Sequence, residues 1–169
     1  MNNFKTDAEL ARKGDTAAFS RLYALVYKDM YHTALYNLRS PHDAADAVSD
    51  AALDAFETIG KLKDPQAFRA WIMTILFAKI KRKQKEYINS NNSEPDDSAL
   101  YSSGDFDFES SELKDALASL DEDSRSILSL SVLGGYNSGE IAKISGLKAS
   151  AVRSRLSRIK EKLRLRLCE

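Results

Sequence analysis

Helix-breaking residues stand only at boundaries in this chain, and this pattern restricts it to an all-helical fold. Pro41, Pro65 and Pro95 lie between segments whose apolar residues recur every three or four positions. That spacing is the helical period, and no segment alternates for long with the period of two that a strand requires. Because 43% of the residues are hydrophobic, such helices have enough apolar surface to pack around cores.

The first half of the chain predicts a bundle of about four helices. Thr6-Asp7-Ala8-Glu9 is a capping box for a short helix that Gly14 closes, and Asp15 can cap a second helix that runs to about Arg39. A capping side chain followed by proline starts the next two helices, at Ser40-Pro41 and Asp64-Pro65. The third helix carries Val48, Leu53, Phe56 and Ile59 and ends at Gly60, and the fourth carries Phe68, Trp71, Ile72, Ile75, Leu76 and Ile80.

A strongly acidic segment separates this half from the next. Residues 89–112 hold seven acidic and no basic side chains, whereas residues 1–88 and 113–169 have net charges of +3 and +4. Residues 89–111 are polar and lack an apolar period, so we expect a flexible acidic linker that lets the two ends act as separate bodies. Its 23 residues reach at most about 75 Å, or about 26 Å as a random coil. An ordinary hinge and a segment that mimics nucleic acid or lines a positive channel both stay open.

The second half predicts another helical domain, which contains a helix-turn-helix. After a short helix through Leu113, Leu117 and Leu120, Asp121 can cap the next helix. Asn137 and Glu140 then form a cap pair for a short helix, Gly146 marks a tight turn, and the last helix begins near Ala149. The last helix has one apolar stripe, formed by Val152, Leu156, Ile159, Leu163 and Leu167.

The polar face of the last helix is strongly basic. It carries eight cations against one acid, Glu161. Such a helix fits the major groove of DNA, where arginine can read guanine edges and other cations hold phosphates. The alternative is a basic face that only keeps the helix solvated, and the imbalance of charge argues against it.

Two other charged faces lie in the first half. Residues 79–85 contain five cations and no acid, just after the aromatic residues Phe68, Trp71 and Phe77. Cations beside aromatic rings are typical of single-strand binding, although the cations could instead favour the helix C-terminus and Trp71 could belong to the core. On the third helix, aspartates recur every three or four residues, which indicates either a surface for a basic partner or a solvated acidic face.

Several function classes find no support in the residues. The single cysteine, Cys168, excludes an internal disulfide and a cysteine-based zinc site, and no phosphate loop, nucleophile elbow or histidine metal motif is present. We therefore expect no catalytic residue, metal or cofactor, and a protein that is not an enzyme. Without an apolar run of membrane-spanning length or a secretion signal, we expect a soluble cytoplasmic protein with no membrane insertion.

Taken in order, the motifs resemble a known family. Asp43 to Asp50 with Leu53 and Phe56 is similar to a helix that binds core RNA polymerase, and Phe68-Arg69-Ala70-Trp71-Ile72 is similar to an aromatic motif of the same family. Glu140-Ile141-Ala142 and the run from Val152 to Arg158 are similar to its helix-turn-helix. The chain resembles an RNA polymerase sigma factor of the extracytoplasmic-function (ECF) type in the sigma-70 family.

The resemblance implies a division of labour between two helical domains. Residues 1–88 would be a region 2-like domain, 89–111 the linker, and 112–169 a region 4-like domain. Core polymerase would be bound by Asp43, Asp46, Ser49, Asp50 and Asp54. The minus-ten promoter element would be bound and melted with the help of Lys61, Lys63, Trp71, Lys79, Arg82 and Lys83. The minus-thirty-five element would be read by Lys148, Ser150, Arg153, Ser154, Arg155, Ser157, Arg158 and Lys160. The implied partners are core RNA polymerase, promoter DNA and an anti-sigma factor.

Several positions depart from the family pattern. Ser49 replaces a glutamine, Phe77-Ala78 replaces an Arg-Asn pair of the minus-ten helix, and Leu120-Asp121 replaces a Leu-Pro step. In the helix-turn-helix, Lys148 replaces a serine cap and Ala151 replaces a threonine. We therefore expect a diverged promoter sequence. Two other functions remain as alternatives: a regulator that binds an operator without joining polymerase, and a helical adapter or anti-sigma-like protein. The acidic third helix and the Phe68/Trp71 motif argue against the first, and the cations of the last helix argue against the second.

Overall fold

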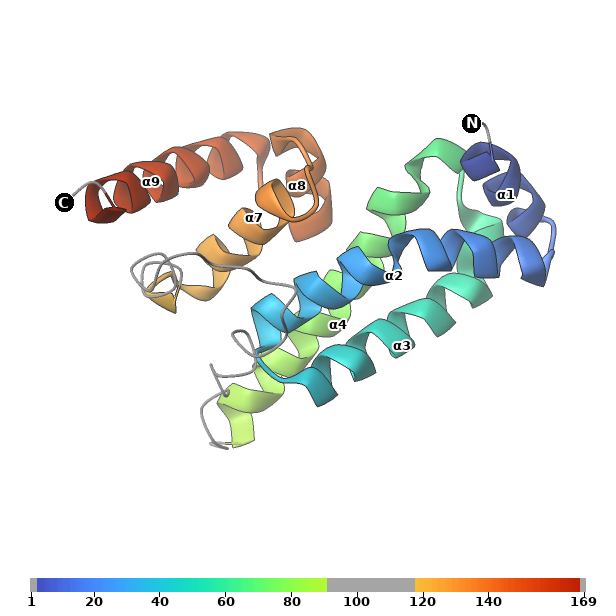
Figure 1. The fold of residues 1–169 in the computed structure, drawn as a ribbon, viewed down its shortest axis with the longest axis horizontal. Helices are drawn as coiled ribbons and strands as arrows, with labels where there is room; N and C mark the ends of the chain where they lie inside the picture. The colour runs from blue at the N-terminus through green and yellow to red at the C-terminus, as the bar shows by residue number, and fades with distance from the viewer. Residues whose placement is uncertain (1–2, 91–117, 168–169) are drawn as a thin grey trace.

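A computed structural model describes residues 3–90 and 118–167, and these residues form helices without a strand (Figure 1). The predicted all-α class is confirmed. The α-helices are α1 (Asn3–Arg12), α2 (Thr16–Leu38), α3 (Pro41–Thr58), α4 (Phe68–Ser90), α7 (Glu122–Val132), α8 (Ser138–Ser145) and α9 (Ala149–Leu167). Two short 3₁₀ helices, η1 (Ile59–Lys61) and η2 (Pro65–Ala67), connect α3 to α4.

Most of the predicted start signals are confirmed by cap hydrogen bonds. Asp15 accepts from the backbone N–H of Ala18 at 3.1 Å, and Ser40 accepts from that of Asp43 at 3.2 Å, with Pro41 at the first turn of α3. The signal at Asp64 opens η2, and α4 begins only at Phe68. The expected start at Thr6 is wrong, because α1 already begins at Asn3 and the ring of Phe4 packs edge-on against that of Phe68 at 5.9 Å.

The first four helices pack around one core. Large side chains of α2 and α4 are completely buried in it, whereas α3 contributes a stripe of small residues. This alanine stripe lets α2 and α4 approach α3 closely, since alanine adds little bulk between helix axes. The stripe consists of Ala44, Ala47, Ala51 and Ala55.

The last three helices form the predicted helix-turn-helix domain. The capping box is present, because the side chain of Asn137 accepts from the Glu140 backbone and the Glu140 carboxylate accepts from the Asn137 backbone. Gly146 ends α8 with a φ of +79°, in the left-handed region that glycine occupies without strain. Of the predicted stripe on α9, Val152, Leu156 and Ile159 are buried and Leu163 is half-buried, while the side chain of Leu167 lies outside the described residues.

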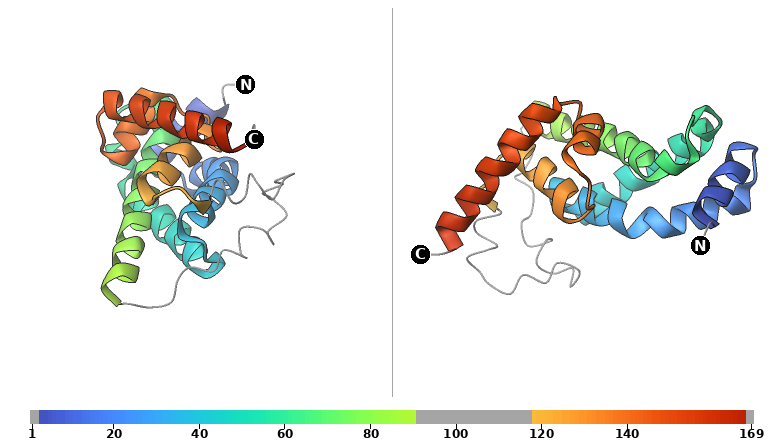
Figure 2. Two further views of the ribbon diagram at one scale, coloured as in Figure 1. Left: turned by 90° about the vertical axis from the view of Figure 1, so that its left-hand side faces the viewer. Right: turned by 90° about the horizontal axis from the view of Figure 1, so that it is seen from above.

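The two halves pack against each other, with α7 on α2 and α8 on α4 (Figures 1 and 2). One cluster of buried side chains contains Phe77 and Ile80 of the first half together with Ile127, Leu130 and Ile141 of the second. The expectation of two bodies that act separately is therefore wrong for this structure. The reason is that α7 and α8 carry an apolar face that α9 alone does not cover.

A buried polar network fixes how these halves meet. The side-chain amide of Asn37 accepts from the hydroxyl of Ser126 at 3.0 Å and donates to that of Ser129 at 3.2 Å. Asn37 and Ser129 are 4% and 2% exposed, so water does not replace these bonds in the packed state. Because buried polar groups need hydrogen-bond partners, these bonds favour the one alignment of α7 along α2 in which all three side chains are paired.

The middle of the chain differs in part from the expected domain boundaries. The helix α4 continues through Ser90, two residues beyond the expected end of the first domain. The rest of the acidic linker and the short helix expected at Leu113 and Leu117 lie outside the described residues. In the described ranges no helix combines the length and the apolar character needed to cross a membrane.

Candidate nucleic-acid interface

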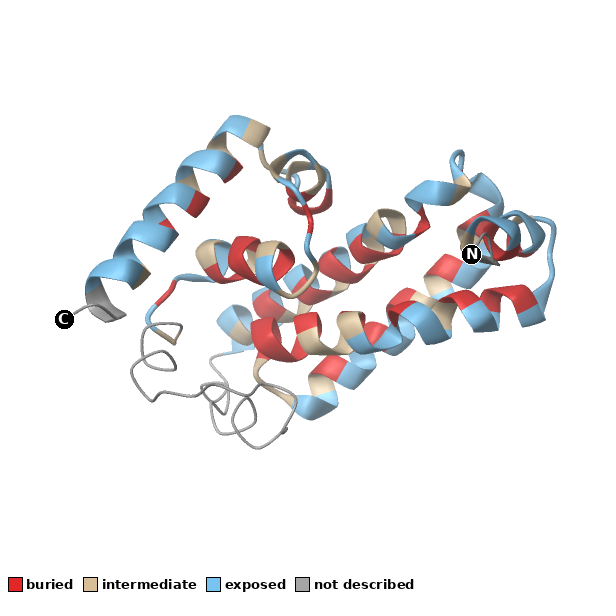
Figure 3. Cartoon of the chain, turned by 45° about the horizontal axis from the view of Figure 1, so that its top comes forward, coloured by how far each residue is buried: buried red, intermediate tan, exposed pale blue. Residues whose placement is uncertain are grey.

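The outer face of α9 holds most of the residues predicted to read the minus-thirty-five element. Seven of the eight are exposed, and Arg155 is half-buried, with its guanidinium 3.6 Å from the carboxylate of Asp123. The buried stripe on the opposite side packs α9 onto α7 and α8, so most of the basic face is exposed (Figure 3). This arrangement leaves a basic helix free to enter a DNA groove.

The cations of α4 are arranged differently. The ammonium group of Lys79 lies 2.5 Å from the carboxylate of Asp54, and that of Lys83 lies 3.3 Å from Asp46 and 4.0 Å from Asp43. The side chains of Lys79 and Lys83 are only 13% and 16% exposed. Two of the lysines predicted to hold DNA therefore neutralise α3 in this structure, whereas Arg82 is exposed and forms no ion pair with the described residues.

The same contacts divide the acidic face of α3 into a part paired with α4 and a part that stays free. Of the residues predicted to bind polymerase, Asp43, Asp46 and Asp54 face the lysines of α4, while Ser49 and Asp50 are exposed without a partner among the described residues. Residues 53 and 56 complete this free surface, because Leu53 is 63% exposed and Phe56 is 46% exposed. The motif analysis placed Leu53 and Phe56 in the helix that resembles a polymerase-binding one, but it did not list them among the residues that would bind polymerase.

The connection between α3 and α4 presents the other predicted minus-ten residues. Lys61 ends η1 and Lys63 follows it, and both side chains are exposed. Trp71 is half-buried, with its ring 6.0 Å from that of Phe68. Trp71 thus belongs to the edge of the core and still presents part of its surface to solvent.

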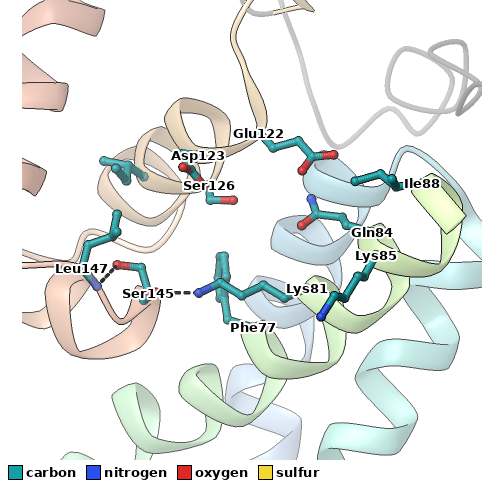
Figure 4. Close-up of a pocket in the computed structure, with 11 residues that line it drawn as sticks. Phe77, Lys81, Gln84, Lys85, Ile88, Glu122, Asp123, Ser126, Ser145 and Leu147 are labelled. Atoms are coloured by element: carbon teal, nitrogen blue, oxygen red, sulfur yellow. Dashed lines mark hydrogen bonds between the residues drawn. The ribbon is translucent and has the colours of Figure 1, made fainter.

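In the packed state, α8 covers part of α4, and α7 lies beside this contact. The ammonium group of Lys81 donates to the backbone carbonyl of Ser145 at 2.6 Å, at the C-terminal end of α8 (Figure 4). Beside this contact is a cavity of about 240 Å³ with cations from α4 on one wall and acids from α7 on the other. Its charged lining residues are Lys81, Lys85, Glu122 and Asp123.

Several titratable groups among the described residues have pKa values displaced by their surroundings. Hydrogen bonds from Ser124 lower the pKa of the Asp121 carboxyl, which caps α7. Burial raises the pKa of the Tyr136 hydroxyl, and Asp29 and Glu140 act in the same direction while Arg69 opposes them. Burial and the carboxylate of Asp43 raise the pKa of Tyr87. These shifts follow from burial and from the hydrogen bonds of the caps and contacts. Within the described ranges no cluster of histidine, cysteine, aspartate or glutamate could hold a metal ion.

Fold and site together define a two-domain helical protein that carries a DNA-reading helix-turn-helix. Family models of two kinds match the chain: "Sigma-70 region 2" matches residues 22–87 and "Sigma-70, region 4" matches residues 110–163. Together these matches span most of the sequence. The chain belongs to the sigma-70 family of RNA polymerase sigma factors, and its two-domain organisation is that of the ECF type. As a sigma factor, it binds core polymerase and directs promoter-specific initiation.

Solved structures agree with this fold. The structure of CnrH in complex with the cytosolic domain of CnrY is 23% identical in sequence, with a TM-score of 0.71, over 98% of this chain and 97% of that one. The sigma factor RpoE in complex with the anti-sigma factor NepR from Bartonella quintana is 22% identical, with a TM-score of 0.72, over 88% of this chain and 96% of that one.

Proposed function

We propose that this sigma factor reads the minus-thirty-five element with the exposed face of α9 and captures the minus-ten element with Lys61, Lys63, Trp71 and the cations of α4. The observation that carries the proposal is the exposure of seven of the eight predicted reading residues, which lie on α9 and at Lys148 just before it. The polymerase would perform the chemistry. Opening DNA costs about 1.4 kcal/mol per stacked step, and an aromatic ring returns about 1–3 kcal/mol per captured base, so a few such contacts can support melting.

The two domains would separate when the protein joins polymerase. The two promoter elements lie more than one duplex turn apart, about 34 Å, whereas the packed state holds α8 on α4. Separation would free Lys81 from Ser145 and expose the face of α4 next to it. The 240 Å³ cavity lies on this same face. We therefore infer that the packed state keeps α4 from DNA while α9 stays exposed.

Core polymerase would dock on the free surface of α3. This surface consists of Ser49, Asp50, Leu53 and Phe56, with Asp43, Asp46 and Asp54 at its edge. Exposed apolar residues next to an unpaired acid are typical of a protein interface, because the apolar contacts supply most of the free energy and the charge supplies orientation.

An anti-sigma factor would act on the packed state. Support comes from RpoE, which was solved with the anti-sigma factor NepR. In this chain, the cavity between α4 and α7 has both signs of charge on its walls, so a segment bound there would contact both domains at once. Such a segment would oppose their separation, since binding to one state shifts the population toward it.

Reconstitution with core RNA polymerase tests the proposal. We expect the complex to start transcripts at defined positions downstream of a two-element promoter, which transcript mapping would locate. Asp50→Arg should reduce polymerase capture in a pull-down, whereas Glu86→Arg, an equal change of charge at an exposed residue of α4, should not. Absence of promoter-dependent initiation would refute the function, and equal capture by both variants would refute the docking surface alone.

A further inference from the structure

A second basic surface lies at the end of the first domain farthest from α9 (Figures 1 and 2). There the C-terminal turn of α1 meets η1, and a Cβ atom at Gly60 would lie 3.9 Å from the backbone oxygen of Arg12. A hollow of about 310 Å³ at this junction is lined by Glu9, Arg12, Lys13 and Gly60. The last turn of α1 and the loop that carries Lys61 therefore form one continuous surface.

Four cations lie on or next to this α1–η1 surface, because Arg12 and Lys13 line the hollow and Lys61 and Lys63 follow Gly60 along the chain. Arg12, Lys13, Lys61 and Lys63 form no ion pair or hydrogen bond through their side chains within residues 3–90 and 118–167. The Nε atom of Arg12 is buried and has no hydrogen-bond acceptor. An Arg12 side chain without an acceptor can turn toward a ligand without breaking a bond, and an acceptor oxygen would relieve the unsatisfied donor.

The acids nearby do not neutralise these cations. Asp64 is occupied as the cap of η2, where it accepts from the backbone N–H of Gln66 at 3.0 Å. Glu9, on the rim of the hollow, is also charged, and it forms no ion pair with a described residue. The surface therefore has unpaired cations, in contrast to the face of α4 where Lys79 and Lys83 already have carboxylate partners.

We infer that Arg12 and Lys13 of α1 bind backbone phosphates of the promoter strand next to the part of the minus-ten element that the loop of Lys61 and Lys63 would bind. The inference rests on the proposed minus-ten role of that loop and adds α1 to the DNA-binding surface. Phosphate fits because the site offers several cations and no apolar pocket or aromatic ring for a base. Continuity with the loop favours DNA over an acidic protein, since a strand that leaves the loop has to cross this surface.

The test measures promoter binding by the reconstituted holoenzyme at several salt concentrations. Arg12→Ala with Lys13→Ala should weaken binding about tenfold at moderate salt and reduce the slope of log K against log[salt] by roughly two, with no change in sequence preference. The matched control is Lys5→Ala with Lys28→Ala, which removes two exposed cations from α1 and α2 outside this surface and should leave both quantities unchanged. Thermal unfolding should be the same for all three proteins, because neither pair forms internal bonds.

Two results would overturn the inference. An unchanged salt slope would show that Arg12 and Lys13 do not contact phosphates. A loss of affinity for core polymerase measured without DNA would assign the surface to a protein partner instead. If the wild-type holoenzyme bound no promoter at all, the proposed function itself would fail together with the inference, so the two failures are distinguishable.

Discussion

The two cationic helices α9 and α4 use their charges in opposite ways. On α9, the predicted reading residues other than Arg155 are exposed, and among them only the half-buried Arg155 forms an ion pair within the described part of the chain. On α4, Lys79 and Lys83 contact aspartates of α3, and Lys81 holds the end of α8. A similar density of positive charge is therefore exposed on one helix and largely engaged in contacts within the protein on the other.

The positions of the helices explain the difference. The helix α4 contacts α2, α3 and α8, so most of its circumference faces protein. The helix α9 contacts α7 and α8 along one stripe, and Figure 3 shows the remainder exposed. The lysines of α4 that lie beside the acidic helix α3 form ion pairs within the protein. Most cations of α9 have no acidic helix beside them and stay available for a ligand.

Arg153→Ala should produce the largest effect, because an arginine that reads a guanine edge contributes about 1–3 kcal/mol. We expect promoter-dependent transcription by the holoenzyme to fall about 10- to 100-fold at limiting protein, without a change in melting temperature. The control is Arg155→Ala, since Arg155 is half-buried and paired with Asp123. It should reduce transcription less and lower the melting temperature. Equal effects of the two variants on both measurements would contradict the distinction between free and engaged cations.

Lys83→Glu tests the cations of α4 that are paired within the protein. It would place a carboxylate next to Asp43 and Asp46 in a site that is only 16% exposed, so the free energy of unfolding should fall by about 1–2 kcal/mol. Arg82→Glu, the neighbouring change on the exposed side of α4, should leave stability unchanged and reduce only promoter opening. Chemical denaturation and a promoter-melting assay measure the two effects. If Arg82→Glu destabilised the protein as much, the pairing of α4 with α3 would not be what distinguishes these lysines.

Local signals in the sequence predicted the helices and the helix-turn-helix, because caps and turns depend on neighbouring residues. Ser40, Asp121 and Asn137 each cap the helix that the sequence assigned to them. The packing of the two halves was not predictable, since the bond between Ser126 and Asn37 joins residues 89 positions apart and has no local pattern.

The candidate site was predictable in part for a similar reason. The exposed residues of α9 follow from its apolar stripe, which fixes the buried side and so the free side. The partners of Lys79 and Lys83 depend on how α3 lies against α4, although the two helices carry charges of opposite sign at helical spacing. The role of α1 could not be inferred, because only the fold brings Arg12 next to Gly60.

Asn37→Ala should shift the protein from the packed toward the separated state. The substitution removes two hydrogen bonds to α7, each worth about 0.5–1.5 kcal/mol net, and part of this loss is recovered because water hydrates Ser126 and Ser129 when the domains part. We expect an opening equilibrium about fivefold larger, seen as faster hydrogen exchange at the faces of α7 and α2. Ser20→Ala, at an exposed site on α2, is the control. Unchanged exchange in both variants would show that the apolar contacts alone set the packed state.

The ionisation of Tyr136 should have the smallest effect, because it acts only at alkaline pH. Tyr136 is 8% exposed, its hydroxyl lies 3.5 Å from the carbonyl of Arg69, and burial raises its pKa. When the domains separate, the pKa returns toward its ordinary value of about 10. A group with a raised pKa stabilises the packed state fully below that ordinary value and loses this contribution as the pH rises through the raised pKa. Small-angle scattering between pH 8 and pH 11 should therefore show expansion at the alkaline end.

Tyr136→Phe separates this effect from the ionisation of other groups. The phenylalanine ring can keep the contact with the Arg69 guanidinium, which lies 6.0 Å from the ring centre, but it has no proton to lose. The variant should therefore stay compact to a higher pH than the wild type, while the titration of Tyr23 and Tyr87, whose pKa values are also raised, continues in both proteins. An identical expansion of wild type and variant would assign the alkaline transition to those residues, and the contact of Tyr136 with α4 would then not be a pH-sensitive part of the packed state.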